Sequence, residues 1–133
     1  MNTVYAREDW LGADEYIDIV VKSGLNRPVG DRGRIERMLA HANLIVTARQ
    51  EGRLVGLARS LTDFCFCCYL SDLAVDKACQ GHGIGKRLIE ETRRQAGGDQ
   101  TTTLLLSAPG AVTFYQGIRM PQADNCYVYR RQG

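Results

Sequence analysis

The feature that most restricts how this chain folds is a glycine-rich turn between an apolar run and a helical pattern. Three glycines alternate within residues 81–85, after the apolar run at 69–75 and before a helical pattern that begins near Lys86. Glycine lets the backbone curl and approach a ligand closely. Because the turn opens directly into a helix, unpaired N–H groups and the positive end of the helix dipole point into it. The stretch therefore predicts a turn that binds a phosphate or pyrophosphate.

Two common phosphate-binding motifs do not fit this turn. A P-loop requires a glycine where Gln80 stands and a serine or threonine where Arg87 stands. The dinucleotide fingerprint requires its third glycine at the position of Lys86. The remaining pattern is Q-x-x-G-x-G, formed by Gln80, Gly83 and Gly85.

Length and charge narrow the class of protein. With 133 residues, the chain is expected to form one domain spanning 1–133, large enough to bury a core. A net charge of only +2 argues against a broad nucleic-acid interface. No apolar run approaches bilayer length and no targeting signal is recognisable, so we expect a cytoplasmic protein without a membrane partner.

The cysteines favour reduced thiols over a disulfide framework or a metal site. There are five of them, an odd number, and no secretory signal accompanies them. Cys65 and Cys68 have C-x-x-C spacing, but on a strand they would face opposite sides of the sheet. No second Cys or His pair is available to complete a tetrahedral zinc site. We therefore expect buried strand cysteines and no metal.

Hydrophobic patterning and turn signals predict an α+β fold, with a mixed α/β sheet. The expected elements are a strand at 3–7, helices at 13–23 and after Asp31, strands at 43–49, 53–61 and 65–75, a helix from about 86, a strand at 102–106, a short helix through Tyr115 and a last strand at 127–130. This order implies an antiparallel meander followed by a parallel crossover, with helices on both faces. Edge strands near the carboxyl end make a homodimer plausible.

In this order of elements the chain resembles the GNAT superfamily of N-acetyltransferases, and in particular its small bacterial acetyl-CoA-dependent members. Their acyl-CoA loop, [Q/R]-x-x-G-x-[G/A], follows a strand that often ends Leu-Ala-Val, and both are found at 73–85. The late Phe114–Tyr115 resembles the F-Y-x-x-[IL]-G-F segment, although Arg119 and Met120 depart from its Gly-Phe. The resemblance covers nearly the whole chain and implies the GNAT fold, with acetyl-CoA as co-substrate.

The resemblance also implies a set of cofactor-binding residues. Backbone groups of Leu73 and Val75 would pair with the pantetheine arm like an added strand. The amides of the glycine turn would bind the pyrophosphate. Lys86 or Arg87 would add charge near the 3′-phosphate, or each is an ordinary exposed helix cation. Ser107 would lie beside the cofactor where the late strand leaves the central one, or caps the following helix. The full set is Leu73, Ala74, Val75, Gln80, Gly81, His82, Gly83, Ile84, Gly85, Lys86, Ser107 and Tyr115.

Acetyl transfer to an amine requires a neutral amine, a stabilised oxyanion and a proton for the departing thiolate. The resemblance places Tyr115 beside the thioester sulfur, where a phenol with a pKa near about 10 can protonate a thiolate. A backbone N–H near Leu73 would donate to the oxyanion. Asp72 is the leading candidate for the base, acting directly or through water. The alternative is that Asp72 only orders a loop or binds an arginine.

We expect an acetyl-CoA-dependent N-acetyltransferase that acts on a primary amine of a small molecule, or on a peptide amine, by direct transfer in a ternary complex. The amine would enter between the first two helices and the turn at 59–64, with the loop at 24–28 and the pair Arg59 and Asp63 as recognition residues. One alternative is a non-catalytic acyl-CoA sensor or partner protein on the same fold, which Arg119 and Met120 keep open. Another is an ATP site, against which the missing P-loop positions argue.

Overall fold

The computed structural model describes residues 2–132 and contains a five-stranded mixed sheet in the order β1-β2-β3-β4-β5. Neighbouring strands are antiparallel from β1 to β4, and β5 is parallel to β4. The strands are β1 (Val4–Glu8), β2 (Leu44–Gln50), β3 (Arg53–Thr62), β4 (Cys67–Val75) and β5 (Thr102–Leu104). The helices are α1 (Ala13–Ser23), α2 (Arg32–His41), α3 (Ile84–Gln95) and α4 (Val112–Gly117), with 3-10 turns at η1 (Lys77–Cys79), η2 (Gly98–Gln100) and η3 (Pro109–Ala111). The predicted fold class is confirmed.

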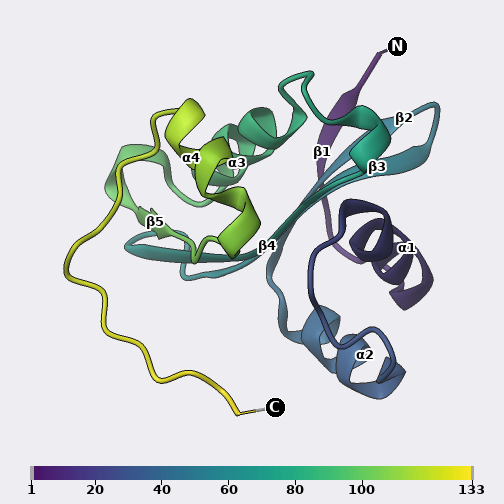
Figure 1. Ribbon diagram of the computed structural model, residues 1–133, viewed down its shortest axis with the longest axis horizontal. Helices are drawn as coiled ribbons and strands as arrows, with labels where there is room; N and C mark the ends of the chain where they lie inside the picture. The colour runs from purple at the N-terminus through teal and green to yellow at the C-terminus, as the bar shows by residue number, and fades with distance from the viewer. Residues whose placement is uncertain (1, 133) are drawn as a thin grey trace.

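Helices cover both faces of the sheet, which gives the molecule two apolar layers (Figure 1). Helices α1 and α2 bury one layer, with Tyr16 and Ile35 at its centre. Helix α3 buries the other, with Leu88 against the opposite face. Among residues 2–132, no helix combines the length and the apolar character needed to cross a bilayer.

The end of α1 and the start of α2 lie where the sequence predicted them. Gly24 ends α1 in the left-handed conformation, at φ 81°, which glycine adopts without steric cost. The Asp31 side chain caps α2 by accepting the Arg34 amide N–H at 3.1 Å. The apolar pattern of this helix places Val21 on or near its buried side, but Val21 is exposed.

A β-bulge in β4 changes which residues face which helical layer. Arg59 is opposite Asp72 and Ser60 is opposite Leu70, so Ser71 has no partner on β3. The extra residue shifts the alternation of side chains. Leu70 therefore packs in the α3 layer, whereas Asp72 faces α1, to which it is hydrogen-bonded. On a regular strand Ser71 and Asp72 would face opposite sides of the sheet, but here the Arg59 guanidinium contacts both.

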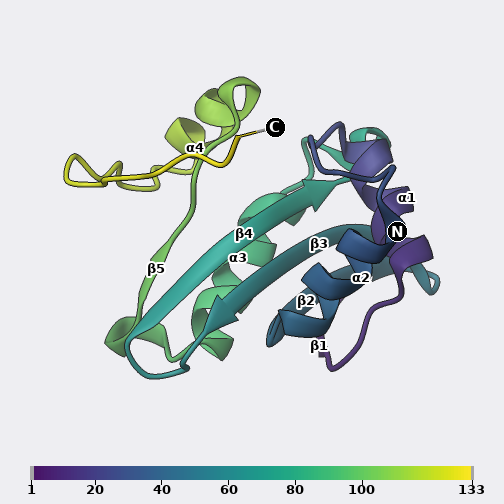
Figure 2. The same cartoon turned by 90° about the horizontal axis from the view of Figure 1, so that it is seen from below.

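Strands β4 and β5 separate after a short stretch of pairing, as Figure 2 shows. The pairing ends with Tyr69 opposite Leu104. Within residues 2–132, no strand therefore lies beside β4 from Leu70 to Val75 on the side away from β3. The apolar run at 104–106 favours a fully buried strand at 102–106, but the observed strand is shorter, Thr102–Leu104, and Leu104 is exposed.

The cysteine-rich segment differs from the prediction. The strand begins at Cys67 because the Asp63 carboxylate accepts the N–H groups of Cys65, Phe66 and Cys67 in a tight turn, at 3.0, 2.8 and 3.0 Å. Cys65 and Cys67 are exposed, and only Cys68 is the buried strand cysteine that was expected.

The last predicted strand, 127–130, is absent from the structure. The tail runs extended away from the sheet in Figure 1, and Tyr127 and Tyr129 are 96% and 104% exposed. Alternating apolar residues favour an extended backbone, but a strand also requires a neighbour for its N–H and C=O groups. Within the described part of the chain, no strand pairs with this segment.

The turn after α4 shows why the family segment has a glycine at the position of Arg119. Arg119 has a φ of 59°, in the left-handed region that favours glycine. Its N–H donates to the Gln116 carbonyl and the Met120 N–H donates to the Tyr115 carbonyl. These two bonds form the Schellman arrangement that ends many helices. The turn therefore keeps its geometry while arginine adopts a strained backbone.

We predict that Arg119→Gly stabilises the protein by about 0.5–1 kcal/mol, because it removes the steric cost of a Cβ in the left-handed conformation, offset in part by the flexibility of the unfolded chain. Urea unfolding measures the change. Arg119→Ala is the matched control, since it removes the charge and keeps the Cβ. An equal gain in both variants would contradict the backbone explanation.

Candidate active site

The glycine turn presents backbone N–H groups that no side chain caps. Gly81 and Gly83 have φ values of 85° and 81°, and Gly83 is the N-cap of α3 without a side-chain hydrogen bond. A Cβ added at either glycine would meet nothing within 4 Å. The first amides of a 12-residue helix thus lie at an open, exposed turn. This arrangement fits an anionic group such as a pyrophosphate.

Gly85 has a different role from the one the sequence suggested. A Cβ at this position would lie 2.9 Å from the Cζ atom of Phe114. The missing side chain therefore lets α4 pack against the first turn of α3. The Phe114 ring meets the Tyr115 ring edge-on, with centroids 5.0 Å apart. This packing fixes the predicted tyrosine relative to the glycine turn.

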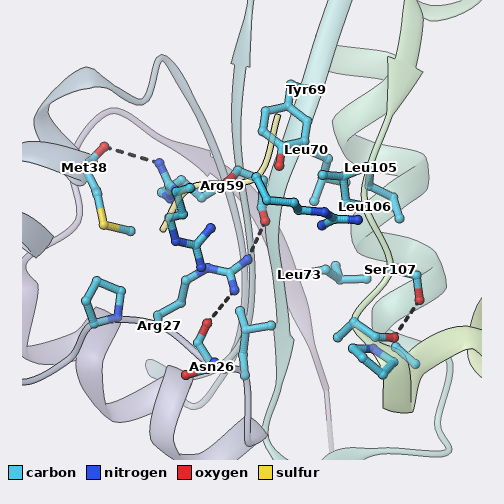
Figure 3. Close-up of a pocket in the computed structure, with 18 of the residues that line it drawn as sticks. Asn26, Arg27, Met38, Arg59, Tyr69, Leu70, Leu73, Leu105, Leu106 and Ser107 are labelled. Atoms are coloured by element: carbon cyan, nitrogen blue, oxygen red, sulfur yellow. Dashed lines mark hydrogen bonds between the residues drawn. The ribbon is translucent and has the colours of Figure 1, made fainter. Parts of the chain in front are cut away.

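A pocket of about 440 Å³ lies at the opening between β4 and the chain that follows β5. Leu73, Ser107 and Tyr115 line it together, so three predicted site residues meet there. Figure 3 shows Arg27 and Arg59 on one side of this pocket, Ser107 on the other and Leu73 between them. The glycine turn is not part of the pocket lining.

Tyr115 is a half-buried phenol at this pocket. Burial raises its pKa above the ordinary value, so the hydroxyl stays protonated at neutral pH. Among residues 2–132, no hydrogen-bond partner is found for this hydroxyl. The phenol therefore has a proton that it can donate.

Asp72 is fully buried and binds three side chains. Its Oδ1 accepts from Arg27 Nε at 2.7 Å, and its Oδ2 accepts from Tyr16 Oη at 2.6 Å and Arg59 Nε at 2.5 Å. Burial by itself raises the pKa of Asp72, but the hydrogen bonds and charges of Arg59, Tyr16 and Arg27 outweigh it and hold the pKa below its usual range. Burial, together with the charge and hydrogen bond of the same carboxylate, raises the pKa of Tyr16.

This environment bears on the two interpretations of Asp72. A general base needs an oxygen that can reach the substrate proton. Both oxygens of Asp72 are engaged, and Asp72 itself is not part of the pocket lining. The geometry fits an arginine-binding carboxylate better than a base.

Three other predicted cofactor-binding residues make contacts within the protein, each in a different part of the site. Ser107 donates to the Ala108 carbonyl at 2.8 Å and does not cap η3, whose N-cap is Ala108. Gln80 donates its side-chain amide to the Val75 carbonyl at 3.1 Å, which closes the base of the turn. Lys86 lies 3.9 Å from Glu90 across one helical turn, as an exposed helix cation does.

The two residues expected to recognise the substrate are separated by the structure. Arg59 lines the pocket, as does the loop at 25–28. Asp63 does not, because its carboxylate is occupied by the turn before β4, whose N–H groups lower its pKa.

Some residues at and beside the pocket were not predicted as site residues. Arg34, Arg130 and Arg131 line the pocket, and Tyr16, which lies outside the lining, binds Asp72. The sequence carries no signal that joins Tyr16 to Asp72, since the two are 56 positions apart. Arg27 lay inside the predicted recognition loop, but its ion pair with Asp72 was not foreseen.

Comparison with known proteins identifies the family of this domain. The sequence profile of the acetyltransferase (GNAT) domain matches residues 29–118. GCN5-related N-acetyltransferase 2, chloroplastic, of Arabidopsis thaliana is 35% identical over 71 residues, which are 53% of this chain and 28% of the relative. The match thus spans under a third of that relative's length.

Solved structures extend the likeness of fold over almost the whole chain. A Staphylococcus aureus protein described as a probable acetyltransferase has a TM-score of 0.78 at 18% identity, covering 98% of this chain and 100% of its own. Ribosomal-protein-alanine N-acetyltransferase of Brucella melitensis has a TM-score of 0.69 at 19% identity, with the same coverage. An aminoglycoside acetyltransferase from a soil metagenome, in complex with sisomicin, has a TM-score of 0.67 at 20% identity, covering 98% and 95%.

The chain belongs to the GNAT family of acetyltransferases. Its match to the family profile includes the glycine turn and Tyr115.

We predict that Asp72→Asn destabilises the protein by about 3–5 kcal/mol, because two buried or half-buried guanidinium groups lose their counter-charge. Because the folded-state pKa of Asp72 is lowered, the stabilisation is present above its unfolded pKa of about 3.9 and is lost as pH falls through the folded value. Urea unfolding at neutral and acidic pH measures both effects.

Asp18→Asn is the matched control, since it breaks an exposed ion pair with Lys22 and is expected to cost less than about 0.5 kcal/mol. Similar losses for the two variants would show that the Asp72 cluster adds no particular stability.

Proposed function

We propose that this protein transfers an acetyl group from acetyl-CoA to a primary amine by direct transfer in a ternary complex. The observation that carries the proposal is the pocket where β4 and β5 separate, because it joins Leu73 and Tyr115 to a loop that can receive an acceptor. The family profile supports acetyl transfer in general. Of the similar structures, one is named for ribosomal-protein alanine and another for aminoglycosides, which are different amine acceptors.

The residues present fit the coenzyme in two places. The uncapped start of α3, from Gln80 to Lys86, would hold the pyrophosphate through backbone N–H groups. The open edge of β4 at Leu73, Ala74 and Val75 would pair with the amide groups of the pantetheine arm. Ser107 lies across the pocket and would contact the same arm. When bound, the coenzyme supplies an activated thioester.

Tyr115 is the proposed general acid. Its phenol lines the pocket and its raised pKa keeps it protonated at neutral pH. The proton at Tyr115 Oη would pass to the sulfur as the thiolate leaves, and the backbone N–H near Leu73 would bind the carbonyl oxygen.

We assign Asp72 a positioning role, in which it holds Arg27 and Arg59 at the pocket wall. The described pocket residues include no carboxylate or histidine. Removal of the amine proton therefore falls to solvent water in this proposal.

Tyr115→Phe is expected to bind acetyl-CoA with an unchanged Kd and to lower kcat by about 100-fold, because it removes one proton donor and keeps the ring that packs on Phe114. Isothermal titration gives the Kd, and release of free thiol in an amine panel gives kcat. Tyr129→Phe, on a fully exposed tail tyrosine, is the control and should match the wild type.

No acetyl-CoA binding at submillimolar concentration would remove the proposed enzyme function. Binding without thiol release across the panel would support an acyl-CoA sensor instead. Unchanged turnover in Tyr115→Phe would take away the role of Tyr115 as acid.

The pH profile separates the two roles considered for Asp72. With the pKa of Asp72 below its usual range, a base at this position would be ionised throughout neutral pH, so it would contribute no rise in rate there. If water deprotonates the amine, kcat/KM rises about tenfold per pH unit until the pKa of the amine, about 10.4 for an alkyl amine of the lysine type. A flat profile between pH 6 and 9 would contradict the positioning role.

A further inference from the structure

The pocket has an excess of positive charge. Five arginines line it, and its described lining residues include no aspartate or glutamate: Arg27, Arg34, Arg59, Arg130 and Arg131. The nearest carboxylate, Asp72, lies buried behind the wall and is shared by two of the five. One negative charge thus faces two guanidinium groups, of which Arg59 is only 6% exposed. Unbalanced buried charge is costly, and an anion in the pocket would balance it.

The two inner arginines retain free donors after their contacts within the protein are counted. Arg27 donates to Asp72, to the Asn26 carbonyl and to the Ser71 carbonyl. Arg59 donates to Asp72, to the Met38 carbonyl and to Ser71 Oγ. A guanidinium has five N–H groups, so each has donors left over.

Arg34 supplies a third guanidinium from the first turn of α2. Its amide is fixed by the Asp31 cap, which places its side chain at the pocket rim. Within residues 2–132, its guanidinium makes no ion pair or hydrogen bond. Its charge is therefore available to a ligand.

We propose that the acceptor is an amine that carries a carboxylate, such as an amino acid, and that Arg34 binds this carboxylate with help from the outer N–H groups of Arg27 and Arg59. The planar fork of arginine matches a carboxylate in a bidentate geometry. Apolar side chains in the same pocket, including Leu25, Leu105 and Leu106, suit an apolar amino-acid side chain. The inference rests on the proposed function and specifies its substrate class.

The test compares acceptors that share one aromatic side chain and differ at the carboxylate. Because the carboxylate and the amide also change the pKa of the neighbouring amine, kcat/KM is expressed per neutral amine for each acceptor. L-phenylalanine is expected to have a kcat/KM about 10- to 100-fold above those of L-phenylalaninamide and phenethylamine. This is the factor by which a charge-assisted hydrogen bond to the carboxylate would strengthen substrate binding. Arg34→Gln should abolish most of this ratio by raising KM for the acid. Arg37→Gln, on the same helix but outside the pocket, should leave the ratio as in the wild type.

A binding measurement makes the result independent of turnover. By isothermal titration, N-acetyl-L-phenylalanine should bind the wild type at least about tenfold more tightly than its amide, and Arg34→Gln should remove the difference. Acetyl-CoA should bind Arg34→Gln and wild type equally; weaker binding would mean that Arg34 serves the coenzyme and would overturn the inference.

The two proposals fail in different ways. Turnover of amines with no preference for the acid overturns the carboxylate site and leaves the acetyltransferase proposal standing. Arg34-dependent binding of N-acetyl-L-phenylalanine without any turnover supports the carboxylate site and overturns the catalytic function.

Discussion

The arrangement of the pocket depends on one buried carboxylate. Asp72 ties together α1 through Tyr16, the loop after α1 through Arg27, and β3 through Arg59. These contacts hold one wall of the pocket at a fixed distance from the edge of β4. Each bond is charge-assisted or buried, and removing the common partner would leave cations without compensation. The acceptor side of the site is therefore positioned by electrostatics more than by apolar packing.

The opposite wall is positioned by shape. Gly85 lets Phe114 approach the start of α3, and this contact brings the neighbouring Tyr115 to the pocket. Between the two walls, β4 and β5 diverge after Leu104 and leave the β4 edge open. A charged wall, a packed wall and an unpaired strand edge thus meet where the proposed reaction takes place.

Sequence reasoning predicted the parts of this structure that depend on local signals. The end of α1 at Gly24 and the start of α2 at Asp31 follow from capping chemistry. The glycine turn before α3 follows from the spacing of its residues. It did not predict the partners of Asp72, because no periodicity links a helix residue to a strand residue far along the chain. It also placed a strand at 127–130, since alternation predicts an extended backbone but not whether a neighbouring strand is present to pair with it.

The bulge at Ser71 has a consequence for how this segment can vary. The unpaired residue is what turns Asp72 toward α1 while Leu70 faces α3. Deleting Ser71 would leave Leu70 and Asp72 as neighbours on opposite faces, so regular alternation would keep the carboxylate toward α1. Pairing Ser71 regularly with β3 at unchanged length would instead put Leu70 and Asp72 on the same face, and one of the two layers would receive the wrong side chain. The strand therefore tolerates the loss of its extra residue better than the loss of the bulge that accommodates it.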